Sequence, residues 1–221
     1  MGSEMCIRDR SGKNQCKESL LKEMNLPIQL GNPLFGVVSR LYHQKGLDLL
    51  LRALPEFLEE TKANFVILGS GDSQQEKAFK DFAGSYPNRV SVLIGFDDGL
   101  ARRIFGGSDF FLMPSRFEPC GLAQQYAMRY GSIPIARKTG GLADTIRPAH
   151  SSESCPNGFI FEDIDFNSLI RVFHKAIELH ANRKNFARMR KNAMNSSFSW
   201  DIAAEKYLQI YRWTMEKSST F

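Results

Sequence analysis

The sequence predicts an α/β protein with a Rossmann-like parallel sheet flanked by helices, and with further helices from its C-terminal third covering the sheet. Two observations predict this fold. From Pro33 onward, short apolar, β-branched or aromatic runs alternate with longer amphipathic segments, which is typical of repeated strand–helix units. In addition, 43% of the 221 residues are hydrophobic, which is enough for one substantial core.

Six short apolar runs are the predicted strands, because each is bounded by glycine, proline or polar residues. In chain order they are 35–39 (FGVVS), 65–68 (FVIL), 90–94 (VSVLI), 110–113 (FFLM), 133–135 (IPI) and the weaker 159–161 (FIF).

The segments between these runs predict crossover helices. Over 45–61, leucines recur three and four residues apart, as on the buried stripe of a surface helix. Segments 73–85, 100–106 and 121–130 are the further predicted crossovers. From Ile164 to the end, apolar residues at helical spacing, including Phe173, Phe186, Tyr207 and Tyr211, predict three helices covering the sheet.

Residues 1–11 are predicted to be an adapter-like or artefactual tail outside the fold, because they have the pattern of neither regular structure. Residues 12–221 are then predicted to form one domain.

Composition narrows the function classes. The four cysteines are scattered without a C-x-x-C pair, which argues against zinc or redox chemistry. No run approaches the roughly 18 apolar residues of a membrane span, and the N-terminus lacks a secretory core, so we expect a soluble intracellular protein. The net charge of +5 suits an anionic ligand.

A basic cluster in the C-terminal third has two interpretations. It is either a nucleic-acid patch or a solvated helix face, and the lack of an aromatic platform favours the second. Its members are Arg183, Lys184, Arg188, Arg190 and Lys191. We therefore expect neither a nucleic-acid nor a membrane partner.

Unusual polar residues follow five of the predicted strands. In an open parallel sheet these carboxyl ends form one rim, where ligands bind. Gly121 and the pair Gly140-Gly141 start predicted helices, where backbone N–H groups and the helix dipole suit a diphosphate; tight turns are the alternative reason for these glycines. Gly69-Ser70-Gly71 with Asp72 is better explained as a turn that caps the next helix.

No G-x-G-x-x-G or G-x-x-x-x-G-K-[ST] loop follows the first strand, which weakens the case for nicotinamide chemistry or ATP hydrolysis.

The stretch 115–122, SRFEPCGL, resembles bacterial glycogen synthases and plant starch synthases, which are retaining glycosyltransferases of the GT-B fold. The resemblance extends in order through VSRL at 38–41, QKGLD at 44–48, YGSIP at 130–134 and TGGLADT at 139–145. It covers roughly residues 12–217.

This resemblance implies one half of a two-domain enzyme. The C-terminal domain would bind the nucleotide sugar, and an N-terminal domain absent from this chain would bind the α-glucan acceptor. The implied reaction transfers glucose from ADP-glucose in α-1,4 linkage with retention, and UDP-glucose is the alternative donor. No cofactor or metal is expected. The compartment would be the bacterial cytoplasm, or the plastid for a plant-type source, and the isolated half would be inactive.

The resemblance also assigns roles to residues. Arg40 and Lys45 would clamp the donor diphosphate and stabilise it as the leaving group, whereas surface ion pairs are the ordinary alternative. Glu118 would hydrogen-bond a glucose hydroxyl, or else be an acid that offsets a helix dipole. Phe96 would stack on the base, or merely pack at the rim. The remaining implied contacts are Cys120, Gly121 and Leu122, mainly through their backbone, and Thr139, Gly140 and Gly141 beside the distal phosphate.

Two departures and two alternatives remain. The wider family's second acid is Tyr126 here, and no lysine-glycine-glycine loop precedes Arg40. The alternatives to a glucan synthase are another retaining GT-B transferase and a non-catalytic module that binds nucleotide or glucan.

Overall fold

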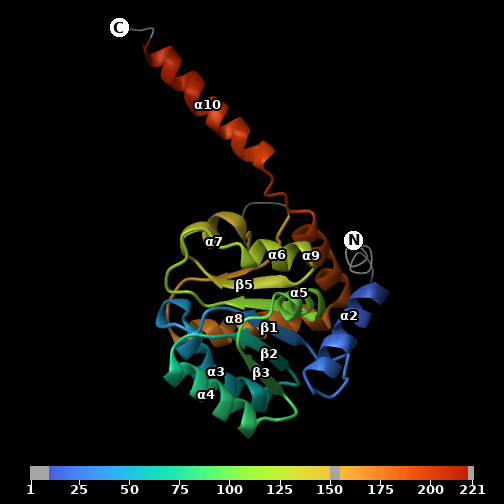
Figure 1. Ribbon diagram of the computed structural model, residues 1–221. Helices are drawn as coiled ribbons and strands as arrows, with labels where there is room; N and C mark the ends of the chain where they lie inside the picture. The colour runs from blue at the N-terminus through green and yellow to red at the C-terminus, as the bar shows by residue number, and fades with distance from the viewer. Residues whose placement is uncertain (1–9, 150–154, 219–221) are drawn as a thin grey trace.

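The computed structural model describes residues 10–149 and 155–218, and it contains the predicted parallel sheet (Figure 1). The six strands lie in the order β3-β2-β1-β4-β5-β6. Their bounds are β1 Leu34–Val38, β2 Asn64–Gly69, β3 Val90–Ile94, β4 Phe110–Met113, β5 Ile133–Arg137 and β6 Phe159–Phe161. All neighbouring pairs are parallel, so the predicted fold class is confirmed.

Aromatic packing holds the centre of the sheet together. In register, Phe35 of β1 lies between Phe65 of β2 and Phe110 of β4. Its ring stacks on theirs, with centroids 4.9 and 5.0 Å apart. The strand order reverses between β1 and β4, and in open α/β sheets the crevice at such a switch point is where ligands bind.

Helices cover both faces of the sheet, and each face has its own apolar core. One core packs the sheet against α3, α4 and α8, and the other packs it against α2, α5, α6 and α7, while α9 contributes to both. The bounds are α2 Arg10–Glu23, a 3-10 turn η1 His43–Lys45, α3 Leu47–Glu60, α4 Ser73–Ser85, α5 Asp98–Gly107, α6 Ala123–Arg129, α7 Gly140–Thr145, α8 Phe166–Ala181, α9 Arg183–Met194 and α10 Trp200–Ser218.

The glycine-rich turn after β2 has the predicted capping role. Asp72 is the N-cap of α4, and its side chain accepts hydrogen bonds from the backbone N–H groups of Gln74 and Gln75.

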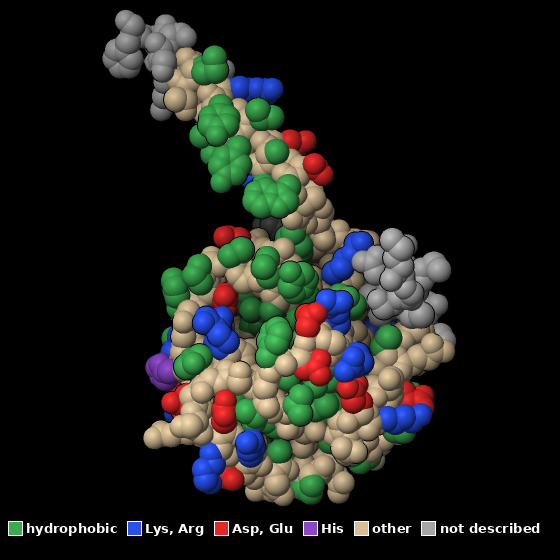
Figure 2. All heavy atoms as spheres, in the orientation of Figure 1, with side chains coloured by type: hydrophobic (Ala, Val, Ile, Leu, Met, Phe, Trp, Pro, Cys, Tyr) green, Lys and Arg blue, Asp and Glu red, His purple; other side chains and the backbone are tan. Residues whose placement is uncertain are grey.

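The last helix, α10, contradicts the prediction of three covering helices. α8 and α9 pack against the sheet, but α10 projects away from the globule (Figure 1). Figure 2 shows hydrophobic side chains along its surface, and Tyr207 and Tyr211 are 57% and 62% exposed. Helical spacing of apolar residues identifies a helix with an apolar side, but it does not identify what that side packs against.

The helix α2 is an element that the sequence analysis did not identify. It begins at Arg10, two residues before the predicted domain start, while residues 1–9 of the predicted tail lie outside the described residues. Its pattern is concealed because Lys13 and Lys17 are buried alongside Leu20 and Leu21.

Hydrogen bonds and ion pairs compensate the two buried lysines. Lys17 contacts Asp109 at 2.6 Å, and Lys13 donates to the Tyr130 carbonyl at 3.0 Å. Burial alone would raise the pKa of Asp109. The charge of Lys17, the His180 imidazole 3.6 Å away and the charge of Arg190 outweigh burial and hold this pKa well below its usual range.

The same cluster corrects the interpretation of the basic residues in α9. Arg190 does not lie on a solvated face, because its guanidinium donates to Asp109 at 3.1 Å and lies 4.4 Å from the centroid of the Phe186 ring. At least one of the five cations therefore belongs to the interior.

Within the described ranges, no helix is both long and apolar enough to cross a bilayer.

Candidate functional site

A pocket of about 200 Å³ opens at the carboxyl ends of β1 and β4, beside the switch point of the sheet. Five residues predicted from the resemblance are among its lining residues: Arg40, Lys45, Glu118, Gly121 and Leu122. The remaining lining residues are Val38, Ser39, Leu47, Leu112, Met113, Pro114, Ser115 and Ala123. Residues 73 positions apart in the chain, such as Lys45 and Glu118, therefore meet in one cavity.

Lys45 and Glu118 form the polar centre of this pocket. Lys45 Nζ lies 2.6 Å from Glu118 Oε2, and the two side chains are only 16% and 11% exposed. Ser115 donates its hydroxyl to the same carboxylate oxygen at 3.3 Å. Glu118 lies before α6, which begins at Ala123, so it is not an acid in the first turn of that helix. The alternative role for Lys45 was a surface ion pair. Lys45 does form an ion pair, but the pair lies within the pocket.

Arg40 lies at the mouth of the pocket, and its side chain is exposed. Among the described residues, no hydrogen bond or ion pair to its guanidinium is found, so its donors face solvent. A guanidinium in this position presents a planar fork that matches a phosphate.

A second charged pair positions the loop that carries Glu118. Arg116 donates to both oxygens of Asp48, at 2.5 and 2.7 Å, and to the His43 carbonyl at 2.8 Å. The hydrogen bonds and charge of Arg116 beside Asp48 lower the pKa of this carboxyl. Arg137 donates to the Ser115 carbonyl at 2.9 Å and also to the Arg116 carbonyl. The β4–α6 loop is thereby tied to η1, which carries Lys45.

Close backbone approaches explain three of the glycines. A Cβ at Gly46 would overlap the Pro114 carbonyl, one at Gly140 would overlap the Glu118 carbonyl, and one at Gly141 would overlap the Cys120 carbonyl. Gly46 and Gly140 also have left-handed φ values of 66° and 42°. These positions therefore require glycine for packing, whatever ligand the pocket binds.

The start of α7 lies directly against the β4–α6 loop. Thr139 is the N-cap position of α7, and the Gly141 N–H donates to the Pro119 carbonyl at 3.1 Å. Cys120 is exposed beside Gly121, whose φ is 73°. The two loops predicted to contact the donor are thus in backbone contact with each other.

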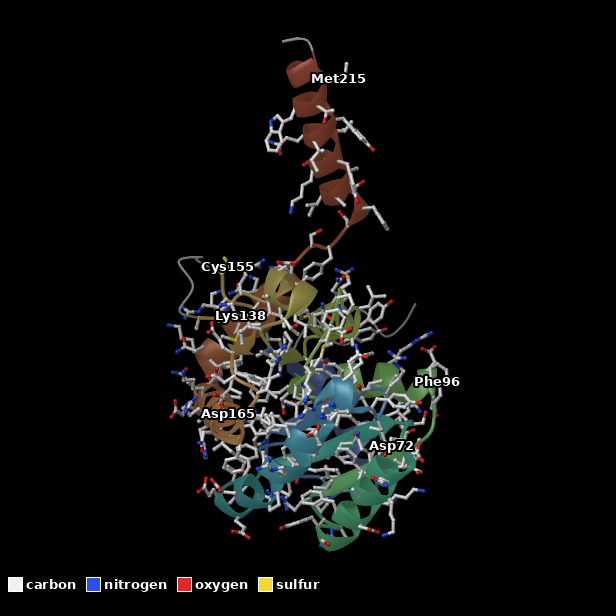
Figure 3. All side chains as sticks on the ribbon, turned by 90° about the vertical axis from the view of Figure 1, so that its left-hand side faces the viewer. Asp72, Phe96, Lys138, Cys155, Asp165 and Met215 are labelled. Carbon is white, nitrogen blue, oxygen red and sulfur yellow. The ribbon has the colours of Figure 1, made fainter. Side chains whose placement is uncertain are left out.

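Phe96 lies apart from the pocket. It follows β3, the edge strand, and is 92% exposed. Figure 3 shows Phe96 and Asp72 on one side of the molecule and Lys138 on the other. Since neighbouring strands are about 4.8 Å apart, β3 lies roughly 10 Å from β1 across the sheet.

Sequence reasoning gave no role to several residues that shape this site. Asp48 and Arg116 occur only as parts of motifs, and neither Arg137 nor Gln124 is assigned a role. A glutamine at a buried helical position, one turn before Met128, is the signal that could have identified Gln124. No cluster of three or more His, Cys, Asp or Glu residues suited to a metal occurs in the part of the chain that the structure describes.

Comparison with known proteins supports the resemblance. Residues 22–195 match the family of glycosyl transferases group 1. A glycogen synthase of Exiguobacterium sibiricum is 46% identical over 201 residues, which are 91% of this chain and 41% of that protein. A glycogen synthase of Desulforudis audaxviator is 43% identical over 208 residues, 94% of this chain and 41% of the relative. The chain therefore spans about two fifths of the length of these relatives.

Solved structures agree with the fold. The catalytic domain of starch synthase IV from Arabidopsis thaliana, solved with ADP and acarbose, matches with a TM-score of 0.85 at 34% identity, over 93% of this chain and 43% of that one. HepE from Anabaena, solved with UDP and glucose, matches with a TM-score of 0.61 at 20% identity over 94% and 52%, which shows the fold alone.

The predicted resemblance to bacterial glycogen synthases and plant starch synthases is thus confirmed, and the match over residues 22–195 shows that the chain belongs to the glycosyl transferases group 1.

Proposed function

We propose that this chain is the donor-binding half of an α-1,4-glucan synthase that transfers glucose from ADP-glucose to the non-reducing end of an α-glucan, with retention. The observation that carries the proposal is the largely buried Lys45–Glu118 pair, which lies in a pocket at the switch point with Arg40 at its mouth. The names of the relatives and the ADP in the starch synthase IV structure support the same substrate class.

The pocket offers both charges that glycosyl transfer requires. As the bond between glucose and diphosphate breaks, negative charge grows on the diphosphate and the sugar becomes positively charged. Arg40 and Lys45 would stabilise the diphosphate. Lys45 has three N–H donors, so it can keep its bond to Glu118 and still donate to a phosphate oxygen.

Glu118 would accept a hydrogen bond from a glucose hydroxyl with its second carboxylate oxygen, because the interactions described above engage Oε2. Cys120, Gly121 and Leu122 would contact the sugar or phosphate mainly through the backbone, and Thr139, Gly140 and Gly141 the distal phosphate.

The base would lie towards β3, with Phe96 stacked on it. A nucleoside can bridge the roughly 10 Å between β1 and β3, and an exposed ring offers an apolar face. Acceptor binding would come from an N-terminal domain outside this chain. No cofactor other than the donor sugar nucleotide enters this proposal, and the compartment would be the cytoplasm, or the plastid in a plant-type source.

Calorimetric titration of the full chain with ADP, UDP and ADP-glucose tests the proposal. We expect ADP and ADP-glucose to bind, and Arg40→Ala or Lys45→Ala to weaken ADP binding by about tenfold or more, the equivalent of one charge-assisted hydrogen bond. The thermal midpoint should stay close to that of the wild type for Arg40→Ala, since that side chain is exposed.

Three outcomes would argue otherwise. Preference for UDP would favour another retaining transferase of this architecture. Nucleotide binding that never supports transfer to glycogen, even with the upstream half restored, would favour a non-catalytic binding module. No binding of any nucleotide would contradict the proposal.

A further inference from the structure

We infer that Gln124 is a positioning residue that holds the two donor-contacting loops in one arrangement; this inference rests on the proposed function. Gln124 lies in α6, and its side chain is fully buried. Its amide nitrogen donates to the carbonyls of Cys120 at 3.1 Å and Gly121 at 2.8 Å, and to the Thr145 hydroxyl oxygen at 3.2 Å. One side chain therefore reaches both the β4–α6 loop and α7.

The connection continues to the start of α7. Thr145 donates its hydroxyl to the Gly141 carbonyl at 2.6 Å, so its oxygen accepts from Gln124. Gly141 in turn donates to the Pro119 carbonyl. A closed ring of hydrogen bonds thus links the backbone on either side of the predicted phosphate and glucose contacts.

The orientation of the amide follows from its partners. If the group were flipped, the oxygen Oε1 would face the carbonyls of Cys120 and Gly121, and two pairs of acceptors would repel. In the observed orientation, Oε1 is buried with no protein donor among the described residues. An apolar side chain would avoid this unfavourable burial, so the physical reason for a glutamine here is that its two N–H donors are shared among these three oxygens.

The backbone of Gly121 also requires a glycine beside Gln124. It has a left-handed φ of 73°, and a Cβ there would lie 2.5 Å from Gln124 Oε1. Gly121 lines the pocket, whereas Gln124 does not. Gln124 therefore acts through the residues that it holds rather than by touching the donor.

The test compares Gln124→Met with Gln125→Met. Methionine keeps the length of the side chain but cannot donate. Gln125 is a matched control because, among the described residues, its side chain makes one hydrogen bond, of 3.4 Å, to the Gly121 carbonyl. Binding of ADP and AMP is titrated well below the thermal midpoint of each variant. We expect Gln124→Met to weaken ADP binding by about tenfold and AMP binding by less than about threefold, and Gln125→Met to change neither.

Comparing the losses of ADP affinity and AMP affinity distinguishes a positioning role of Gln124 from a general loosening of the fold. Unchanged ADP binding in Gln124→Met, or equal losses for ADP and AMP, would overturn the inference while leaving the proposed function standing. If wild-type chain binds no ADP, the proposed function fails and this role with it.

If Gln124→Met does not fold, Thr145→Val is the second variant. It removes the hydroxyl that accepts from Gln124 and donates to the Gly141 carbonyl, so it breaks the same ring of hydrogen bonds. It should weaken ADP binding selectively, and wild-type affinity in that variant would count against the inference. If both variants fold, the double variant should bind ADP no more weakly than Gln124→Met alone, because both changes break one connection.

Discussion

At the scale of single residues, two ion pairs lie in and beside the candidate pocket. Lys45 of η1 with Glu118, and Asp48 of α3 with Arg116, pair these two elements with the β4–α6 loop. Arg40 and Phe96 point outward at the same ends of the strands. Under the proposed function, the paired residues would preorganise the pocket, and the two exposed ones would meet a nucleotide that arrives from solvent.

Phe96→Ala tests the outer part of this arrangement. Removing an exposed ring should not affect folding, but it should weaken ADP binding by about 3- to 30-fold if the ring stacks on the base. Pyrophosphate binding should be unchanged, because that ligand has no base. Calorimetry with both ligands measures the difference, and Trp200→Ala, which removes a similarly exposed ring from α10, is the control. Equal losses for the two ligands would exclude stacking.

At the scale of elements, the spacing of apolar residues predicted the strands and helices whose buried side chains are apolar. It missed the helix whose buried side chains include charged ones. The strands agree to within two residues at each end, because a run such as FFLM in β4 is buried on both sides. The helix α2 was missed because its inward positions include Lys13 and Lys17, whose partners lie outside the helix and include residues distant in sequence, such as Ser132 and Asp109.

The residues of the candidate site also differ in whether a local sequence pattern points to them. Arg40, Lys45 and Glu118 belong to motifs, so the sequence could name them as candidates, and the structure brings the three to one pocket. The contribution of Gln124 depends on α7 approaching α6, which no local pattern of the chain encodes.

The turn between η1 and α3 makes a prediction of its own. Gly46→Ala should destabilise the protein by more than about 1 kcal/mol, because φ is 66° and the new Cβ would overlap the Pro114 carbonyl. The displaced turn carries Lys45, so ADP binding should weaken too. Urea unfolding measures the first effect and calorimetry the second.

Gly84→Ala is the matched control for this turn. Gly84 lies in α4 with open space around its Cα, so alanine should stabilise the protein by about 0.5 kcal/mol and leave ADP binding unchanged. A Gly46→Ala variant as stable as the wild type would refute the account of the turn.

At the scale of the whole molecule, both apolar cores of the globule are formed without residues of α10. Of the described side chains at positions 200–215, none belongs to either apolar core, and the family match ends at residue 195. Trp200 and Met215 are 84% and 71% exposed, which is unusual for side chains of their size on a monomeric surface.

Deleting residues 199–221 should therefore leave the fold unchanged. We expect the thermal midpoint to move by less than about 2 °C, because a loss of 1 kcal/mol would move it by about 2–4 °C in a protein of this size. ADP affinity should also be retained.

Deleting residues 1–23 is the contrasting change. It removes Leu20, Leu21 and the Lys17–Asp109 pair, and it leaves a buried carboxylate without its closest cation. That variant should lose its cooperative thermal transition. If instead the deletion of α10 abolished the transition, then α10 would be part of the folded unit, and its exposed apolar side chains would have to pack against the globule in solution.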